Sequence, residues 1–203
     1  MKFSAQELLA LLIAVSFAAG LNVYATVATL GLLGHTGWVS LPASLHLLTS
    51  WWVITASLAL FAVEFVADKI PAFDLLWNAL HTFIRVPVAA LLAYQATSGL
   101  SPMEQVAAAA LGGAIALAAH GGKTAARAAV TPSPEPFSNI GLSTAEDVGA
   151  VGLTSLATMH PYLAGGIALA LVVVVLIVIR MVWKSVRRLF RRGEGKSGTA
   201  LQR

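Results

Sequence analysis

The residues best suited to chemistry are carboxylates that interrupt apolar segments of the chain. Glu64, Glu146 and Asp147 each lie within or at the end of such a segment. A charged residue at the centre of a membrane helix costs about 2.5–3.5 kcal/mol on insertion scales. Ionisable residues in that setting therefore either take part in ion, proton or solute binding or pair with one another.

Cationic and polar residues occur nearby at helical spacing. Asn78, His81 and Arg85 follow one another at intervals of three and four, and so do His120, Lys123 and Arg127. Residues at these intervals share one helix face, so each set predicts a polar stripe. The stripes can line a common cavity. Alternatively, the cations can pair with the carboxylates and hold the helices together, or the cationic side chains can extend to the lipid headgroups.

Two further residues are expected at helix starts. Asp74 is placed to cap a helix beginning near Leu75, and Asn139 or Ser138 to cap the helix after a proline-rich loop. The predicted polar cavity or transport site comprises Asn22, Glu64, Asp68, Asp74, His81, Arg85, His120, Lys123, Arg127, Asn139, Glu146 and Asp147.

Several kinds of chemistry have no support in the sequence. The chain has no cysteine, and it has no nucleophile elbow, phosphate loop, dinucleotide fingerprint or paired-histidine metal motif. We therefore expect no catalytic residues, no cofactor and no metal site, and we do not expect an enzyme.

Composition indicates the setting in which these residues act. The chain has 203 residues, of which 58% are apolar and 11% charged, against about 45–50% and about 25% in soluble domains. These values predict an all-α polytopic membrane helix bundle over residues 1–182. Six apolar runs are candidate spans, namely Leu8–Leu33, Trp51–Val66, Ala79–Ala96, Val106–Ala119, Ile140–Ala157 and Tyr162–Ile179.

Two of the predicted segments contain helix breaks. A helix over residues 4–34 would be about 46 Å long, whereas the hydrocarbon core is about 30 Å thick. Gly20 and Asn22 are the natural place for a break, which would give a broken helix or a re-entrant pair. One tilted helix and a cleaved signal peptide are the alternatives. A second break or re-entrant segment is expected at Pro132–Pro136.

The distribution of basic residues predicts orientation. With six alternating spans, the segments at 35–50, 97–105 and 158–161 contain no Lys or Arg, which favours an N-in and C-in topology in a cell inner membrane. Residues 183–203 then form a basic cytoplasmic tail. Anionic inner-leaflet lipids are its expected partners, rather than nucleic acid, through Arg180, Lys184, Arg187, Arg188, Arg191 and Arg192.

Several motifs resemble those of a known family. They are the stretches Glu64–Asp74 and His81–Pro87, His120–Lys123 with Arg127, Ser133–Asn139, and the pair Glu146 and Asp147. The chain resembles, through these motifs, a family of small bacterial integral membrane proteins classified only as a domain of unknown function. The resemblance implies a multi-pass inner-membrane protein and implies no activity, substrate or catalytic residue.

Two classes of function fit these features. The first is a channel or secondary transporter for an ion or small polar solute with a cytoplasm-facing polar site. The second is a non-transporting membrane module that organises lipids or partner proteins, or that handles lipid headgroups. A homo-oligomer is a further expectation, because small residues are dense on several predicted helices.

Overall fold

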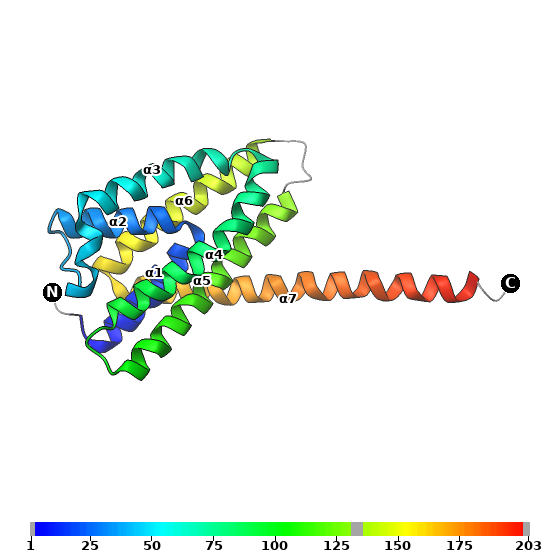
Figure 1. Ribbon diagram of the computed structural model, residues 1–203. Coiled ribbons are helices and arrows are strands. Elements are labelled where there is room, and N and C mark those ends of the chain that lie inside the picture. The colour runs from blue at the N-terminus through cyan, green and yellow to red at the C-terminus, as the bar shows by residue number, and fades with distance from the viewer. Residues whose placement is uncertain (1–2, 131–135, 201–203) are drawn as a thin grey trace.

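The computed structural model contains helices joined by short turns, and no strand occurs in the part of the chain that it describes. It describes residues 3–130 and 136–200, without the side chains of 71–75, 128–130, 136, 138, 139, 182, 185, 186 and 188–200. The elements are α1 (Ala5–Leu21), α2 (Val23–His35), the 3-10 helix η1 (Ala43–Thr49), α3 (Trp51–Ala67), α4 (Pro71–Ala96), α5 (Pro102–Val130), α6 (Pro136–Met159) and α7 (Pro161–Ala200) (Figure 1). The predicted all-α class is confirmed.

Helices α1 and α2 are separated by a single residue, Asn22. Its extended backbone, at φ −149° and ψ 105°, ends α1, and its side-chain oxygen accepts a hydrogen bond from the amide of Ala25 at 2.9 Å. Asn22 thus caps the N-terminus of α2, which is the role that asparagine favours. The predicted break near Gly20 is confirmed, and one tilted helix over residues 4–34 is excluded.

The two short helices fold back on each other. Phe3, just before α1, lines a pocket together with Leu41 and Pro42, and Gly34, at the end of α2, also lies against Leu41. The outer ends of α1 and α2 therefore lie at the same end of the bundle, and Asn22 forms the tip of a helical hairpin inside it (Figure 1). Of the arrangements expected from the sequence, the re-entrant pair is the one observed.

The hairpin differs from the five helices that follow it. Helices α3 to α7 run between the two ends of the bundle, whereas α1 and α2 together return to the end where they began (Figure 1). The start of α7 lies beside α1, where Gly165 faces the Ala10 carbonyl, and α7 then extends away from the bundle at the opposite end. The start of α1 and the end of α7 thus lie at opposite ends of the bundle (Figure 1), and the N-in and C-in orientation, which assumes that residues 4–34 cross, stays a prediction.

Judged by length and hydropathy, fewer helices are candidate membrane spans than the six that the sequence predicted. In the described residues, three helices are long and apolar enough to cross a membrane: Leu76–Ala96, Pro102–Arg127 and Pro161–Met181. A fourth is added if η1 and α3, which meet at 61°, are one bent span. The count of six therefore stays a prediction.

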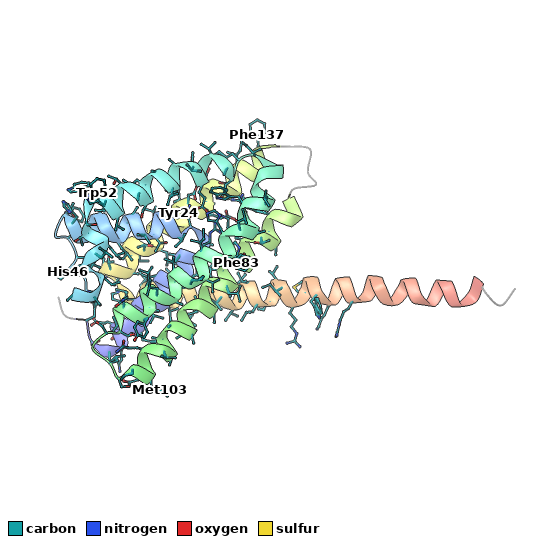
Figure 2. All side chains as sticks on the ribbon, viewed as in Figure 1. Tyr24, His46, Trp52, Phe83, Met103 and Phe137 are labelled. Atoms are coloured by element: carbon teal, nitrogen blue, oxygen red, sulfur yellow. The ribbon has the colours of Figure 1, made fainter. Side chains whose placement is uncertain are left out.

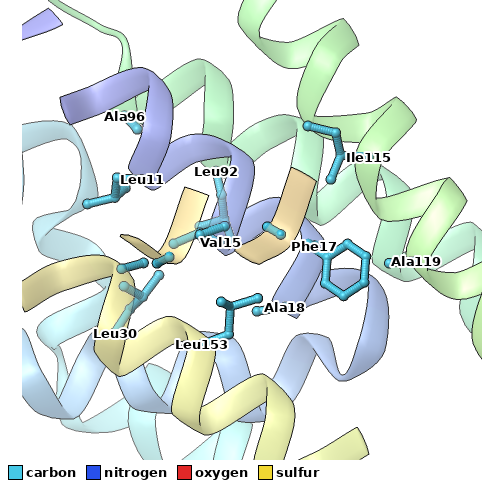
Figure 3. Close-up of a cluster of buried hydrophobic side chains, with 14 of the residues drawn as sticks. Leu11, Val15, Phe17, Ala18, Leu30, Leu92, Ala96, Ile115, Ala119 and Leu153 are labelled. Atoms are coloured by element: carbon cyan, nitrogen blue, oxygen red, sulfur yellow. The ribbon is translucent and has the colours of Figure 1, made fainter. Parts of the chain in front are cut away.

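A core of apolar side chains holds the hairpin in the bundle. Leu11, Val15 and Phe17 of α1 pack with Leu30 of α2 and with side chains from α4, α5 and α6 (Figure 3). Gly20, near the tip, lies so close to α5 that an added Cβ would stand 2.5 Å from the Ala116 carbonyl oxygen. The tip can approach α5 only because this position has no side chain.

Two expected helix caps are displaced. The fourth and sixth helices begin at Pro71 and Pro136, so Asp74 and Asn139 lie inside their first turns and are not cap residues. Proline suits the first helical position, because its fixed φ is helical and its missing N–H would have no partner there. The side chains of Asp74 and Asn139, and the part of the expected break at Pro132–Pro136 that precedes α6, lie outside the described residues.

The topology gives a first prediction. Because the chain has no cysteine, single cysteines can be introduced at Ser4, Ser101 and Trp183 and labelled with a membrane-impermeant maleimide in sealed vesicles of one orientation. We expect Ser4→Cys and Ser101→Cys to be labelled from one side and Trp183→Cys only from the other. Labelling of Ser4→Cys and Trp183→Cys from the same side would contradict the hairpin.

Candidate functional site

Four helices contribute charged side chains to one buried cluster. Each side chain is at most 7% exposed, although three are cations and three are carboxylates. The charge cluster, as we call it, consists of Glu64 on α3, Asp68 just after it, Arg85 on α4, Lys123 and Arg127 on α5, and Glu146 on α6. Its formal charges sum to zero.

Lys123 is shared among all three carboxylates of the charge cluster. Its Nζ lies 2.9 Å from Asp68 Oδ2, 3.3 Å from Glu146 Oε2 and 3.7 Å from Glu64 Oε1. It also donates to the carbonyl of Leu21, the last residue of α1, at 3.2 Å. Lys123 therefore joins the hairpin tip to α3 and α6.

Arg127 holds the end of α3 against α6. One terminal nitrogen lies 2.5 Å from Glu146 Oε2 and 2.9 Å from Asp68 Oδ2, and Nε donates to Glu146 at 3.2 Å. The other terminal nitrogen donates to the Asp68 carbonyl at 3.1 Å. A planar guanidinium can make several such bonds at once, which suits it to buried carboxylate pairs.

Arg85 connects the charge cluster to a histidine. It pairs with Glu64, both side chains being fully buried, and donates to Asn78 Oδ1 at 3.3 Å and to His120 Nδ1 at 2.9 Å. Because arginine only donates, Nδ1 of His120 must accept. Its Nε2 then carries the proton and donates to the Asn78 carbonyl at 3.1 Å, so the contacts hold His120 as a neutral imidazole.

The second stripe histidine is held in the opposite tautomer. His81 Nδ1 lies 2.8 Å from the Trp77 carbonyl and so donates to it, while Nε2 lies 3.1 Å from the Tyr24 hydroxyl and accepts from it. Tyr24 is on α2 just beyond the hairpin tip, inside the bundle (Figure 2). A neutral imidazole has one donor and one acceptor, and these contacts use both.

The hairpin tip also contacts the remaining acidic residue. Asn22 donates through Nδ2 to Asp147 Oδ1 at 2.8 Å, and Asn22 is fully buried. Glu146 and Asp147 are adjacent on α6 and point about 100° apart, so Glu146 faces the cations and Asp147 faces the tip. The hairpin is thus tied to α6 by a contact that spans 125 residues of sequence.

Some buried polar atoms have no hydrogen-bond partner. They are Glu64 Oε2, Arg85 Nε, Ser143 Oγ and Asp147 Oδ2. Buried polar atoms without partners are uncommon in folded proteins and call for an explanation, such as a bound ion or water.

A pocket opens at the other end of the bundle, beside the N-terminus. It has a volume of about 510 Å³ and is lined by residues that include Phe3, Leu41, Pro42 and Ser98. Apolar side chains of the hairpin, among them Leu11, lie between this end and the charge cluster. The polar interior is therefore closed toward this end by an apolar layer.

The structure brings together the predicted site residues whose side chains it describes. Asn22, Glu64, Asp68, His81, Arg85, His120, Lys123, Arg127, Glu146 and Asp147 are all buried, at 7% exposure or less. The site list omitted Tyr24, Asn78, Thr82 and Ser143. Asn78 and Thr82 had a signal, because they lie three residues before and one residue after His81. Ser143 had a signal as well, because it lies four residues before Asp147. Tyr24 had none, since only the folded hairpin brings it to the site.

The predicted lipid-binding residues lie apart from this site. Arg180, Lys184 and Arg187 are exposed on α7, and the Arg187 guanidinium lies 5.6 Å from the ring centre of Trp183. The side chains of Arg188, Arg191 and Arg192 lie outside the described residues. No contact in the structure tests lipid binding.

The fold and the site together define a class: a helical protein with three or four candidate membrane spans, whose bundle encloses a charge cluster beside the tip of a helical hairpin. Within that class, the chain belongs to the family described as "Domain of unknown function (DUF4126)", which it matches over residues 9–181. Neither the curated proteins nor the solved structures contain a match to the chain. The family resemblance expected from the sequence is confirmed, and the family assigns no activity.

The buried pairs give a second prediction. Arg85→Met leaves the Glu64 carboxylate buried without its partner, and removing one member of a buried pair costs about 3–5 kcal/mol. We expect a loss of this size in unfolding free energy, measured by tryptophan fluorescence during chemical unfolding in detergent.

The double variant Glu64→Gln/Arg85→Met removes both charges and should recover part of the loss. Arg180→Met, at an exposed arginine of α7, is the matched control and should leave stability unchanged. A double variant no more stable than Arg85→Met would show that the two side chains do not act as a pair.

Proposed function

We propose that this protein is a channel or secondary transporter for an ion or small polar solute, with the charge cluster as its site. The proposal places it as a multi-pass protein of a bacterial inner membrane and assigns it no enzymatic activity. The observation that carries it is the position of Lys123, which lies within 4 Å of three carboxylates and also contacts the hairpin tip.

Because Lys123 has three carboxylate partners, it can occupy two alternative states that differ in which carboxylates it pairs with. Movement of Lys123 from Asp68 and Glu146 toward Glu64 exchanges one set of pairs for another without leaving the ammonium unpaired. Because Lys123 also holds the Leu21 carbonyl, such an exchange is coupled to the hairpin. Broken helices that meet at a buried polar site are typical of transporters, where their ends contact ions and substrates.

The ends of the bundle support an orientation for this proposal. Lys69, Arg127 and the basic residues of α7 lie toward one end, and the segments at 35–50, 97–105 and 158–161 at the other contain no Lys or Arg. Positive charge collects on the cytoplasmic side, so the basic tail lies inside and the N-terminus outside. The pocket beside Phe3 is then an outer vestibule, closed from the site by the apolar layer.

A second candidate function follows from the burial of the ion pairs in the charge cluster. The charge cluster is almost fully enclosed, as expected if it only locks α3 to α6 in a module that organises lipids or partner proteins. The exposed basic residues of α7 favour anionic lipids as partners of such a module. Small residues at helix contacts, such as Gly165 against Ala10, favour close helix packing in either candidate.

Transport is tested by flux through the reconstituted protein. Proton flux is followed with a pH-sensitive dye, and sodium, rubidium and chloride fluxes with radiotracers, in liposomes of defined composition. We expect the wild type to carry at least one of these ions and Lys123→Met to reduce that flux at least tenfold, because the shared cation is lost. Glu146→Gln should have an effect of the same kind.

The controls are exposed residues of the same types. Lys184→Met and Glu104→Gln change exposed side chains outside the charge cluster and should leave the flux unchanged. If folded Lys123→Met and Glu146→Gln proteins retain wild-type flux, the charge cluster does not conduct. Absence of protein-dependent flux for every ion tested would favour the module that organises lipids or partners.

A further inference from the structure

Asp147 is a buried carboxylate that has no cationic partner. It is 4% exposed, Oδ1 is bonded only by the side chain of Asn22, and Oδ2 has no partner. None of the ion pairs among the described residues includes Asp147, whereas its neighbour Glu146 pairs with Lys123 and Arg127. An isolated ionised carboxylate is strongly unfavourable in a low-dielectric interior, so a positive charge or a proton is missing at this position.

A second unpartnered oxygen lies on the same helix face. Ser143 is one turn before Asp147 on α6, is fully buried, and its Oγ has no hydrogen-bond partner. Residues four apart on a helix are neighbours on its surface. Two oxygens without partners are therefore presented side by side toward the interior of the bundle.

The C-terminal end of α1, at the hairpin tip, lies close to Asp147. Asn22, which bonds Asp147, follows directly after the C-terminus of α1 at Leu21. A helix C-terminus carries partial negative charge and attracts cations. The C-terminal ends of broken helices coordinate Na⁺ or receive protons in membrane transporters. The N-terminus of α2 is capped by Asn22 Oδ1. At the end of α1 the Leu21 carbonyl accepts from Lys123 and the Ala18 carbonyl from the Asn22 amide, so this helix end contributes its partial negative charge to the site.

The balance of charge sets the valence of the missing group. The charge cluster is neutral, with three cations and three carboxylates, and the contacts of His81 and His120 hold both imidazoles neutral. Asp147 then leaves one negative charge among these buried side chains, because Lys69, the further cation that acts on Asp147, is only partly buried and donates to the Phe65 carbonyl. No group of three or more His, Asp or Glu among the described residues is arranged to hold a metal ion, so a site with several carboxylate ligands, as divalent ions prefer, is not formed.

We propose that Asp147, Ser143 and the C-terminal end of α1 form a binding site for one monovalent cation, either a proton or Na⁺. A proton would neutralise Asp147 directly, and Na⁺ would bind Asp147 Oδ2 and Ser143 Oγ. The site is distinct from the charge cluster but shares the hairpin with it. The charged groups close enough to act on Asp147 are Glu64, Asp68, Lys69 and Lys123, with Glu146 beside it on α6.

This inference deepens the proposed function and rests on it in one respect, namely that the bound cation would be the coupling ion of transport. Occupation of the site neutralises Asp147 and so weakens its attraction for Lys123, which is the residue shared by the charge cluster. Cation binding at the hairpin tip would in this way bias the pairing of Lys123.

The site is tested by cation-dependent stability of the purified full-length chain in lipid nanodiscs. The melting temperature is followed through the fluorescence of its five tryptophans. In one arm, Na⁺ replaces choline at constant ionic strength and pH 8. In the other, pH falls from 8 to 5.5 without Na⁺. A ligand that binds only the folded protein raises its stability, by about 3–6 °C when the ligand is tenfold above its Kd.

We expect the wild type to be stabilised in one arm, and Asp147→Asn to lose that response. Asparagine keeps the shape and can still accept from Asn22, so the variant is the one best able to fold. Ser143→Ala should weaken a Na⁺ response at least tenfold in concentration and leave a pH response unchanged, which distinguishes the two ions. Glu104→Gln, at an exposed carboxylate, should behave as the wild type.

The inference is overturned if Asp147→Asn responds as the wild type does in both arms, or if the wild type responds in neither. This readout does not depend on flux. A cation response that requires Asp147, in a protein that carries none of the ions tested, would leave the site standing and remove the transport proposal. Flux that requires Lys123, in a protein whose stability does not respond to cations, would support transport and overturn the cation site.

Discussion

The structure depends on one physical requirement: charges that leave water must find partners. Moving a charged group into a low-dielectric interior costs several kcal/mol even after relaxation, and only close opposite charges and hydrogen bonds offset that cost. Here Arg85, Lys123 and Arg127 meet three carboxylates within 4 Å. No single helix contains both members of any of these pairs. The four helices and the hairpin tip must therefore pack together for the charges to be paired.

The sequence predicted the identity of these residues well because charge is rare in it. Each charged residue within an apolar run is costly, so Glu64, Lys123 and Glu146 were informative by position alone, and spacing placed Arg85 and Arg127 on common faces with histidines. Pairing of these cations with the carboxylates was one of the expected arrangements and is observed, but which residues pair was not predictable. Helical periodicity shows which residues share a face of one helix, but not which faces meet, and the partner of Arg85 lies 21 residues away on another helix.

The path of the N-terminal segment shows a different limit. Gly20 and Asn22 predicted a break, but hydropathy and length are the same for a kinked crossing and for a hairpin. Contacts with distant residues decide between them: Gly20 against Ala116 of α5, and Gly34 against Leu41. The side of the membrane on which the chain begins stays a prediction for this reason, whereas the segments at 35–50, 97–105 and 158–161, which contain no Lys or Arg, do lie at one end of the bundle (Figure 1).

The hairpin has a consequence for the way the chain is assembled. Its helices, of 17 and 13 residues, are short for a crossing, and their polar partners are synthesised after them. Lys123 lies 102 residues after Leu21, and Asp147 lies 125 residues after Asn22. Until α5 and α6 have been made, the Leu21 carbonyl and the Asn22 side-chain amide lack these partners. The hairpin therefore cannot make its final contacts before both later helices have been synthesised.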